Sequence, residues 1–187
     1  EDFQGWSGSQ GIRRYSDEGQ IEDGTWCGLG LPARDQSIKT NMKIHREQID
    51  LESKTQIQFM DITDQVQEII ERSRIRECQV LIYVTHTTLG VAINHNESML
   101  LQDFMRVLYK IVPVDDQYTH DLFELKRDSM SDGRSNGHSH CKAILLGNSE
   151  TIPVEKGKVR LTERQNIFAV EFDGSRKRDV LIQVIGI

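Results

Sequence analysis

The sequence predicts an α+β fold, in which many antiparallel strands are combined with a few helices packed on them. Short segments that alternate in polarity or are rich in β-branched residues recur from residue 43 to residue 185. Helical signals occur in only three segments, and the last four strand-like segments follow one another without a helix between them. This order of elements is typical of α+β proteins.

Residues 1–41 differ in composition from the rest of the chain. Half of the fourteen glycines lie between Gly5 and Gly30, among polar residues and without helical or strand periodicity. We interpret this segment as a non-catalytic extension, mobile or draped on the surface, whose tryptophans could dock on the domain or on a neighbouring subunit. The compact domain is expected to span residues 42–187.

The compact domain opens with two strand-like segments and a helix. Lys43–Leu51 alternates as an edge strand does, and Gln56–Met60 is its expected partner. Residues 61–73 form an expected amphipathic helix of about three turns, with Asp61 or Thr63 as its N-cap. The apolar face of this helix consists of Ile62, Val66, Ile69 and Ile70.

A buried strand that ends in a histidine comes next. Val80–Val84 has the composition of a strand buried on both faces, and Val91–Asn94 is expected to be a second strand after a turn at Gly90. His86 therefore lies at the end of a buried strand. Leaving such a polar group unpaired costs roughly 1–3 kcal/mol, so His86 must find a hydrogen-bond partner or a metal.

The rest of the domain alternates helices, a long loop and strands. Ser98–Val112 predicts a second helix that stops at Pro113, and Val114–Gly137 is a polar stretch long enough to be functional or disordered. Asn136–Gly147 predicts a short helix capped by its two end residues. The second helix should turn Leu101, Phe104, Leu108 and Ile111 inward. The expected C-terminal strands are Glu150–Val154, Val159–Leu161, Ile167–Phe172 and Asp179–Ile185.

Composition excludes several classes of protein. A chain of 187 residues with 37% hydrophobic and 28% charged residues is one ordinary domain with an appendage. A net charge of -6 without a long basic stripe argues against nucleic-acid binding. The apolar runs are far shorter than the roughly 20 residues that span a membrane, and we expect no signal peptide. Three cysteines without CxxC spacing favour a reducing compartment, so we expect a cytoplasmic protein with Cys78 and Cys141 as inert core thiols.

Candidate metal ligands are concentrated in one part of the chain, since five of the six histidines lie between residues 86 and 140. They follow different kinds of element, which is how a fold gathers distant segments at one site. Three imidazoles with an open position form a zinc arrangement, and the alternative is a set of scattered structural or surface histidines. On a helix, His138 and His140 would point about 200° apart, so we expect His138 to cap the helix or to face solvent. The five residues are His86, His95, His120, His138 and His140.

Several short motifs occur in a fixed order from Met42 to Ile187. They are His86-Thr-Thr, Ile93-Asn-His-Asn96 with Asp103, Tyr118-Thr-His-Asp121, His138-Ser-His-Cys-Lys-Ala143 with Leu145-Leu-Gly147, and Thr151-Ile-Pro-Val, Gln165-Asn-Ile-Phe and Glu171-Phe-Asp-Gly-Ser-Arg176. Together these motifs resemble the YjbQ family of small proteins. The resemblance leaves residues 1–41 unmatched.

The resemblance implies a YjbQ-like domain with antiparallel strands in two packed sheets and a few helices, assembled as a homotrimer. It also implies a histidine site for zinc or another divalent metal that opens to a pocket for a small phosphorylated molecule. The implied activity is that of a secondary thiamine-phosphate synthase, a transferase of thiamine biosynthesis that joins a pyrimidine methyl pyrophosphate to a thiazole phosphate. The alternative is a metal-dependent hydrolase, or a non-catalytic protein that binds a metal or a small anion.

The resemblance carries roles over to individual residues. The implied metal ligands are His86, His120 and His140. The implied catalytic residues are Asn94, Asp103 and Gln165. The expected cofactor-binding or substrate-binding residues are Thr87, Thr88 and Lys142. Asp103 and Asp121 could orient ligand imidazoles or could only face solvent. His95 stands where the family has a glutamate, a role for which Glu97 is the alternative.

Arginine and lysine side chains, among them Lys142, Arg176 and Arg178, are expected mainly on the exposed faces of the domain. One or two of them beside a zinc would suit a phosphate.

Overall fold

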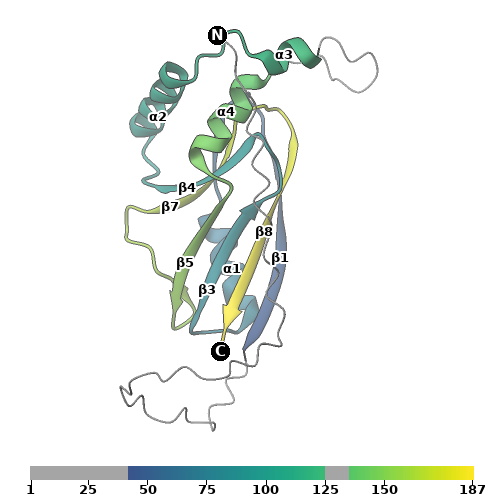
Figure 1. Ribbon diagram of the computed structural model, residues 1–187. Coiled ribbons are helices and arrows are strands. Elements are labelled where there is room, and N and C mark those ends of the chain that lie inside the picture. The colour runs from purple at the N-terminus through teal and green to yellow at the C-terminus, as the bar shows by residue number, and fades with distance from the viewer. Residues whose placement is uncertain (1–41, 125–134) are drawn as a thin grey trace, which may run out of the picture. The chain divides into compact units, whose positions relative to one another are not determined.

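The computed structural model describes residues 42–124 and 135–187, all within one compact unit that spans Lys39–Ile187. The extension expected at residues 1–41 lies outside the described residues. Figure 1 shows how the described strands and helices are arranged. The strands are β1 (Lys43–Glu52), β2 (Gln58–Asp61), β3 (Cys78–Val84), β4 (Leu89–Asn94), β5 (Ser149–Glu155), β6 (Lys158–Val159), β7 (Asn166–Glu171) and β8 (Lys177–Gly186). The helices are α1 (Thr63–Ser73), α2 (Ser98–Ile111), α3 (Thr119–Glu124) and α4 (Gly137–Leu146).

The described strands form two antiparallel sheets, which confirms the predicted α+β class. The larger sheet has the order β1-β8-β3-β5-β6, and the smaller has the order β2-β7-β4. β1 lies at an edge as predicted, but its predicted partner is wrong, because β1 pairs with β8 and the segment at residues 56–60 contributes to β2, which pairs with β7. Pairing with β8 engages all ten residues of β1, whereas β2 has only four residues to offer.

One apolar core joins both sheets with α1. β3 contributes Val80, Ile82 and Val84 to this core, whereas Leu81 and Tyr83 between them are half-buried. The prediction that this strand is buried on both faces is therefore wrong, since its second face is only half covered. The predicted apolar face of α1 is confirmed by the burial of Ile62, Val66, Ile69 and Ile70.

The chain crosses from the larger to the smaller sheet between β3 and β4. The turn lies at Thr87 and Thr88, not at Gly90 as predicted. Gly90 belongs to β4, and a Cβ atom there would come within 3.0 Å of the Leu146 Cβ and 3.2 Å of the Gly147 carbonyl oxygen. A side chain at Gly90 would therefore press on the end of α4, so this glycine suits the close approach of α4 to β4 and does not form the turn.

Helix α2 lies over the smaller sheet without burying any of its side chains. Leu101, Phe104 and Leu108 are half-buried as part of its inner face, but Ile111 is 63% exposed, so the prediction that it points inward is wrong. The helix starts at Glu97, whose carboxylate accepts hydrogen bonds from the first backbone amides, and it ends shortly before a proline as predicted.

The long polar stretch is not a plain loop, because α3 lies within it; residues 125–134 of this stretch are outside the described residues. α4 agrees with the predicted short helix, and Gly147 follows it with a positive φ of 92°. Asn136 precedes α4 but does not cap it through its side chain. The carboxylate of Asp121 takes that role, accepting from the backbone amides of Asn136 at 3.1 Å and Gly137 at 2.8 Å. The four C-terminal strands are confirmed, with β6 shorter than predicted.

Asp61, the last residue of β2, ties the start of α1 to β7 and to the segment between β4 and α2. One carboxylate oxygen accepts from the Thr63 hydroxyl and backbone amide, and the other accepts from the side-chain amides of Asn96 and Asn166, both at 2.8 Å. Burial alone would raise the pKa of Asp61, but these hydrogen bonds outweigh it and hold the pKa below its ordinary value of 3.8.

We predict that Asp61→Asn lowers the free energy of unfolding by about 1–3 kcal/mol at neutral pH, because the amide cannot accept all of these hydrogen bonds. A depressed carboxyl pKa stabilises the fold above the unfolded pKa, and this contribution is lost as the pH falls from about 4 through the folded pKa. Urea unfolding at pH 7 and pH 3 should therefore show less loss of stability with acid in the variant. The exposed Asp50→Asn control should change stability by less than about 0.5 kcal/mol; an equal acid dependence of wild type and Asp61→Asn would contradict the prediction.

Candidate functional site

His86 follows β3, at the point where the chain leaves the larger sheet. Its Nε2 atom lies 2.9 Å from a carboxylate oxygen of Asp179, and the backbone N–H of the same residue in β8 points at Nε2 from 3.2 Å. One nitrogen cannot donate to the carboxylate and accept from the amide at once. The shorter contact is the one to a charged acceptor, so we assign the ring proton to Nε2. Nδ1 is then the nitrogen of His86 that can bind a ligand. Asp179 had no role in the sequence-based prediction of the site.

His140 comes to the same region from α4. It lines two adjoining cavities together with His86, and its ring is hydrogen-bonded to the backbone of Thr87. Burial, followed by the nearby His120, lowers the pKa of His140. The ring centroids of His120 and His140 are 4.8 Å apart in an edge-to-face contact. The fold therefore brings the three predicted metal ligands into one region.

The smaller of the two cavities, about 190 Å³, is the most polar part of this region. Its walls come from the turn between β3 and β4, the start of α4, and the segment from β7 to β8. The lining residues are His86, Thr87, Thr88, Asn136, His140, Asp173, Arg176 and Arg178. Thr87 and Thr88, which were predicted to bind a cofactor or substrate, are among these lining residues.

A buried ion pair supports one wall of this cavity. The Arg178 guanidinium donates to both carboxylate oxygens of Glu171, at 2.6 and 3.0 Å, and to the Thr88 hydroxyl at 2.9 Å. The Glu171 side chain is fully buried and that of Arg178 is 8% exposed. The expectation that Arg178 lies on an exposed face is wrong, because a buried carboxylate at the end of β7 holds it inside.

A second ion pair stands on the neighbouring wall. The Arg176 guanidinium lies 2.9 Å from a carboxylate oxygen of Asp173, and the amide nitrogen of Asn136 donates to the same oxygen at 3.1 Å. The side-chain oxygen of Asn136, Oδ1, is buried and has no hydrogen-bond partner among the residues that the structure describes. Three carboxylates, those of Glu171, Asp173 and Asp179, thus stand against two guanidinium groups, so this region favours a cation when its imidazoles are neutral.

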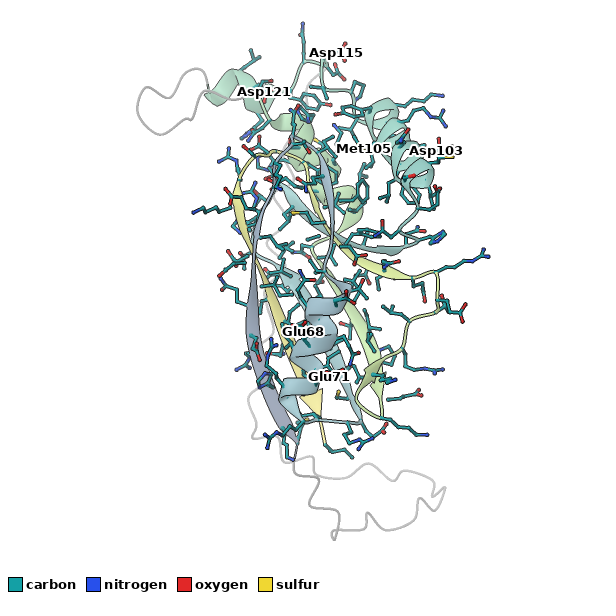
Figure 2. All side chains as sticks on the ribbon, turned by 180° about the vertical axis from the view of Figure 1, so that it is seen from behind. Glu68, Glu71, Asp103, Met105, Asp115 and Asp121 are labelled. Atoms are coloured by element: carbon teal, nitrogen blue, oxygen red, sulfur yellow. The ribbon has the colours of Figure 1, made fainter. Side chains whose placement is uncertain are left out.

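The three predicted catalytic residues do not share this cavity. Asn94 ends β4, about 20 Å along the strand from Thr88 at the usual rise per residue, and its side-chain oxygen accepts from the His95 amide. Gln165 is exposed and accepts from the Thr162 amide. Asp103 is exposed on α2, where it pairs with Arg106 at 2.9 Å, and Figure 2 shows it well apart from Asp121.

Lys142 and His138 are buried under α4. Lys142 is fully buried, 3.2 Å from the Nδ1 atom of His138 and 5.3 Å from the centre of the Tyr109 ring, and it does not line the histidine cavities. Burial lowers the pKa of Lys142. His138 is also fully buried, so the prediction that it caps the helix or faces solvent is wrong.

The predicted burial of the cysteines is also wrong in one case. Cys141 is exposed and Cys78 is half-buried, where burial raises the pKa of its thiol. Helix α4 carries Ile144 and Leu145 on its exposed side while Lys142 lies inside. The usual rule that apolar residues face inward therefore fails along this helix.

The donor set fits a divalent metal in its chemistry. A metal-bound imidazole commonly donates its second ring N–H to a carboxylate or a backbone carbonyl. His86 has Asp179 in this role, and His140 is hydrogen-bonded to the Thr87 backbone. As the side chains stand, no three His, Cys, Asp or Glu residues in the described ranges are arranged to hold a metal ion. The metal site therefore stays a prediction.

The described residues thus form a small α+β domain with a histidine-lined cavity where its two antiparallel sheets meet. A family model described as UPF0047 protein YjbQ-like matches residues 47–187. The chain therefore belongs to the YjbQ-like UPF0047 family, and the resemblance predicted from the sequence motifs is confirmed. Within the described ranges, no helix is both long enough and apolar enough to span a membrane.

Relatives from archaea and bacteria share most of the domain. A UPF0047 protein of Archaeoglobus fulgidus is 38% identical over 138 residues, which cover 74% of this chain and 99% of the relative. The UPF0047 protein YugU of Bacillus subtilis is 32% identical over 130 residues, covering 69% and 90%. A solved structure of a YbjQ-like protein of unknown function from Sulfolobus solfataricus is 31% identical, with a TM-score of 0.71 over 78% of this chain and 99% of that one.

We predict that Glu171→Gln lowers the free energy of unfolding by about 3–5 kcal/mol, because it leaves the Arg178 guanidinium buried without a negative partner. Urea unfolding at neutral pH measures this loss. Arg178→Met should be similarly destabilised. If the two side chains form one unit, the double variant will be more stable than the sum of the single losses predicts, by about 1–3 kcal/mol. Simple additivity would contradict the coupling.

Proposed function

We propose that the protein is a metal-dependent enzyme that acts on small phosphorylated molecules, and that its reaction is thiamine-phosphate synthesis. Zinc or another divalent metal would be held by His86, His120 and His140. The observation that carries this proposal is the pair of imidazoles on one cavity wall, each with a ring nitrogen engaged by Asp179 or Thr87, next to Arg176 and Arg178. Cytoplasmic location and assembly as a homotrimer belong to the same proposal, through the cysteine content and the family resemblance.

The charges of the cavity support a fixed order of binding. With neutral imidazoles, the carboxylates of Glu171, Asp173 and Asp179 outnumber the two guanidinium groups, and each guanidinium is already paired with a carboxylate. An anion entering this cavity alone would meet excess negative charge. A divalent cation reverses the sign, so a phosphorylated ligand should bind only after the metal.

The side chains of the cavity would then have separate tasks. Thr87, Thr88 and the arginines would donate hydrogen bonds to phosphate oxygens, while Asp179 would keep Nδ1 of His86 unprotonated for the metal. A divalent metal supplies Lewis-acid neutralisation of the charge on a pyrophosphate leaving group. In the proposed reaction a carbon–nitrogen bond forms between pyrimidine methylene and thiazole nitrogen as the bond to pyrophosphate breaks.

The second candidate is a metal-dependent hydrolase, or a protein that binds a metal and a small anion without catalysis. It is favoured by the separation of Asn94, Asp103 and Gln165 from the histidine cavity, since the residues to which catalysis was assigned do not meet the proposed ligands. Binding alone needs only the histidines and their supporting partners.

We predict that the metal affinity depends on both the imidazoles and their supporting carboxylate. Tag-free protein loaded with Zn²⁺ should retain about one ion per chain; His86→Ala and His140→Ala should lose it, and Asp179→Asn should bind about 10–100-fold more weakly. Competition with a chromogenic chelator measures these affinities. Two matched controls, His45→Ala and Asp50→Asn, should bind zinc like wild type. His45 pairs with Glu47 on β1, and Asp50 lies directly opposite Asp179 but does not contact His86. Equal zinc affinity in all variants would contradict the assigned ligands.

We predict that metal-loaded protein converts the pyrimidine methyl pyrophosphate and the thiazole phosphate to thiamine phosphate, and that His86→Ala or removal of the metal lowers the rate by about tenfold or more. Chromatographic detection of thiamine phosphate provides the measurement. If no product exceeds the protein-free background while zinc is still bound at His86, the synthase activity is wrong and the binding role stands.

A further inference from the structure

A third cavity, of about 390 Å³, lies between α2 and the smaller sheet, away from the histidines. Its lining comes from β2, β4 and β7 of the smaller sheet and from helices α2 and α4. The lining residues are Phe59, Ala92, Asn94, Phe104, Val107, Leu108, Leu146 and Phe168. We propose that this cavity is a binding site for a small, uncharged aromatic molecule.

The cavity exists because α2 does not close down on the sheet. The helix is amphipathic, yet none of its fourteen residues is buried, and Phe104 and Leu108 remain half-exposed on its inner face. The floor opposite these side chains includes Ala92, which is too small to fill the space between helix and sheet. A volume of this size lies within the range of about 300–1,000 Å³ that is usual for small-molecule sites.

Aromatic rings form three of its walls. The ring centroid of Phe59 is 6.3 Å from that of Phe104, with planes tilted by 33°, and 5.8 Å from that of Phe168, with planes at 84°. The three rings therefore pack on one another through Phe59, and all three line the cavity. Aromatic rings attract one another in offset or edge-to-face contacts at centroid distances of about 4.5–7 Å, so a lining with three such rings favours an aromatic ligand.

The polarity of the lining defines the charge of the ligand. No charged side chain is among the lining residues, so a charged ligand would lose its hydration without gaining a partner. Asn94 is the one polar lining residue, and its side-chain oxygen already accepts from the backbone amide of His95 at 2.8 Å. The side-chain NH₂ group of Asn94 can therefore donate a hydrogen bond to a ligand that carries one acceptor.

This site is independent of the proposed metal-dependent function. The histidine cavities lie at the start of β4 and the apolar cavity at its end, and no lining residue of the apolar cavity belongs to either of them. Failure of one assignment therefore leaves the other intact.

The test uses two fluorescent probes with nearly the same ring system. N-phenyl-1-naphthylamine is uncharged, and 1-anilinonaphthalene-8-sulfonate adds one negative charge to the same frame. We predict saturable binding of the neutral probe to the full chain, at least about tenfold tighter than binding of the sulfonate, because the lining has no partner for the charge. Fluorescence titration measures both affinities.

Two substitutions place the probe in this cavity. Val107→Trp narrows its mouth and Ala92→Leu raises its floor, and each should weaken binding of the neutral probe by about tenfold or more, as expected for filling an apolar site. Met99→Trp is the matched control, because Met99 is exposed on the same helix but is not a lining residue; its affinity should stay within about twofold of wild type. A cooperative thermal unfolding transition in each variant is the control for its folding.

Three results would overturn the proposal. They are non-saturable binding of the neutral probe, equal affinity for the sulfonate, and equal loss of binding in Met99→Trp and Val107→Trp. A change in the number of subunits in Val107→Trp, measured by light scattering, would instead identify the groove as a contact between copies of the chain and would also overturn it.

Discussion

The buried ion pair between Glu171 and Arg178 is the interaction on which the candidate site depends. Glu171 ends a strand of the smaller sheet, and Arg178 begins a strand of the larger one. The same guanidinium donates to Thr88, which lies where the chain passes from β3 in the larger sheet to β4 in the smaller one. Burying two charges is costly, and here the cost is offset by two-point contact and by backbone amides that donate to the carboxylate. Two of the crossings between the sheets, β3 to β4 and β7 to β8, are thereby held against each other.

The residues of the candidate site lie on these two crossings and on α4. His86 and Thr87 belong to the first crossing, and Asp173 and Arg176 belong to the second. α4 brings His140 to them, and its own position is set by α3 through the cap that Asp121 provides. A Cβ atom at Gly137 would come within 2.5 Å of the Tyr118 Cβ, so glycine lets the start of α4 lie close to the residue that precedes α3. Part of the motif around His120 therefore serves to place His140.

Local patterns predicted the helices and most strands, because burial on one face of a helix or strand leaves a period in the sequence. α1 is the clearest case, since Val66, Ile69 and Ile70 follow the helical period and are all buried. The partner of β1 could not be predicted in this way, because β8 lies more than a hundred residues further along the chain. The prediction paired β1 with the next strand-like segment along the chain. In the structure β1 pairs instead with β8, which has ten residues like β1 itself.

The candidate site was predictable only where a residue type itself signals chemistry. The clustering of histidines indicated five candidates, from which the family resemblance selected His86, His120 and His140. The structure places these three in one region. Asp179, Glu171 and the burial of Arg178 gave no such signal, since a charged residue next to a strand is usually exposed. Lys142 gave a misleading signal, because its charge suggested contact with a ligand. The structure instead buries it beside His138, away from the histidine cavities.

The loose packing of α2 on the smaller sheet has a consequence for the motions of the protein. Stability is not uniform within a domain, and segments with few buried apolar contacts open at a smaller free-energy cost than the core strands. α2 buries no side chain, whereas β3 and β8 hold the centre of the larger sheet. Local opening of α2 can therefore occur while both sheets stay folded and the ion pair between them stays intact. Such opening would give a ligand access to the apolar cavity between α2 and the smaller sheet.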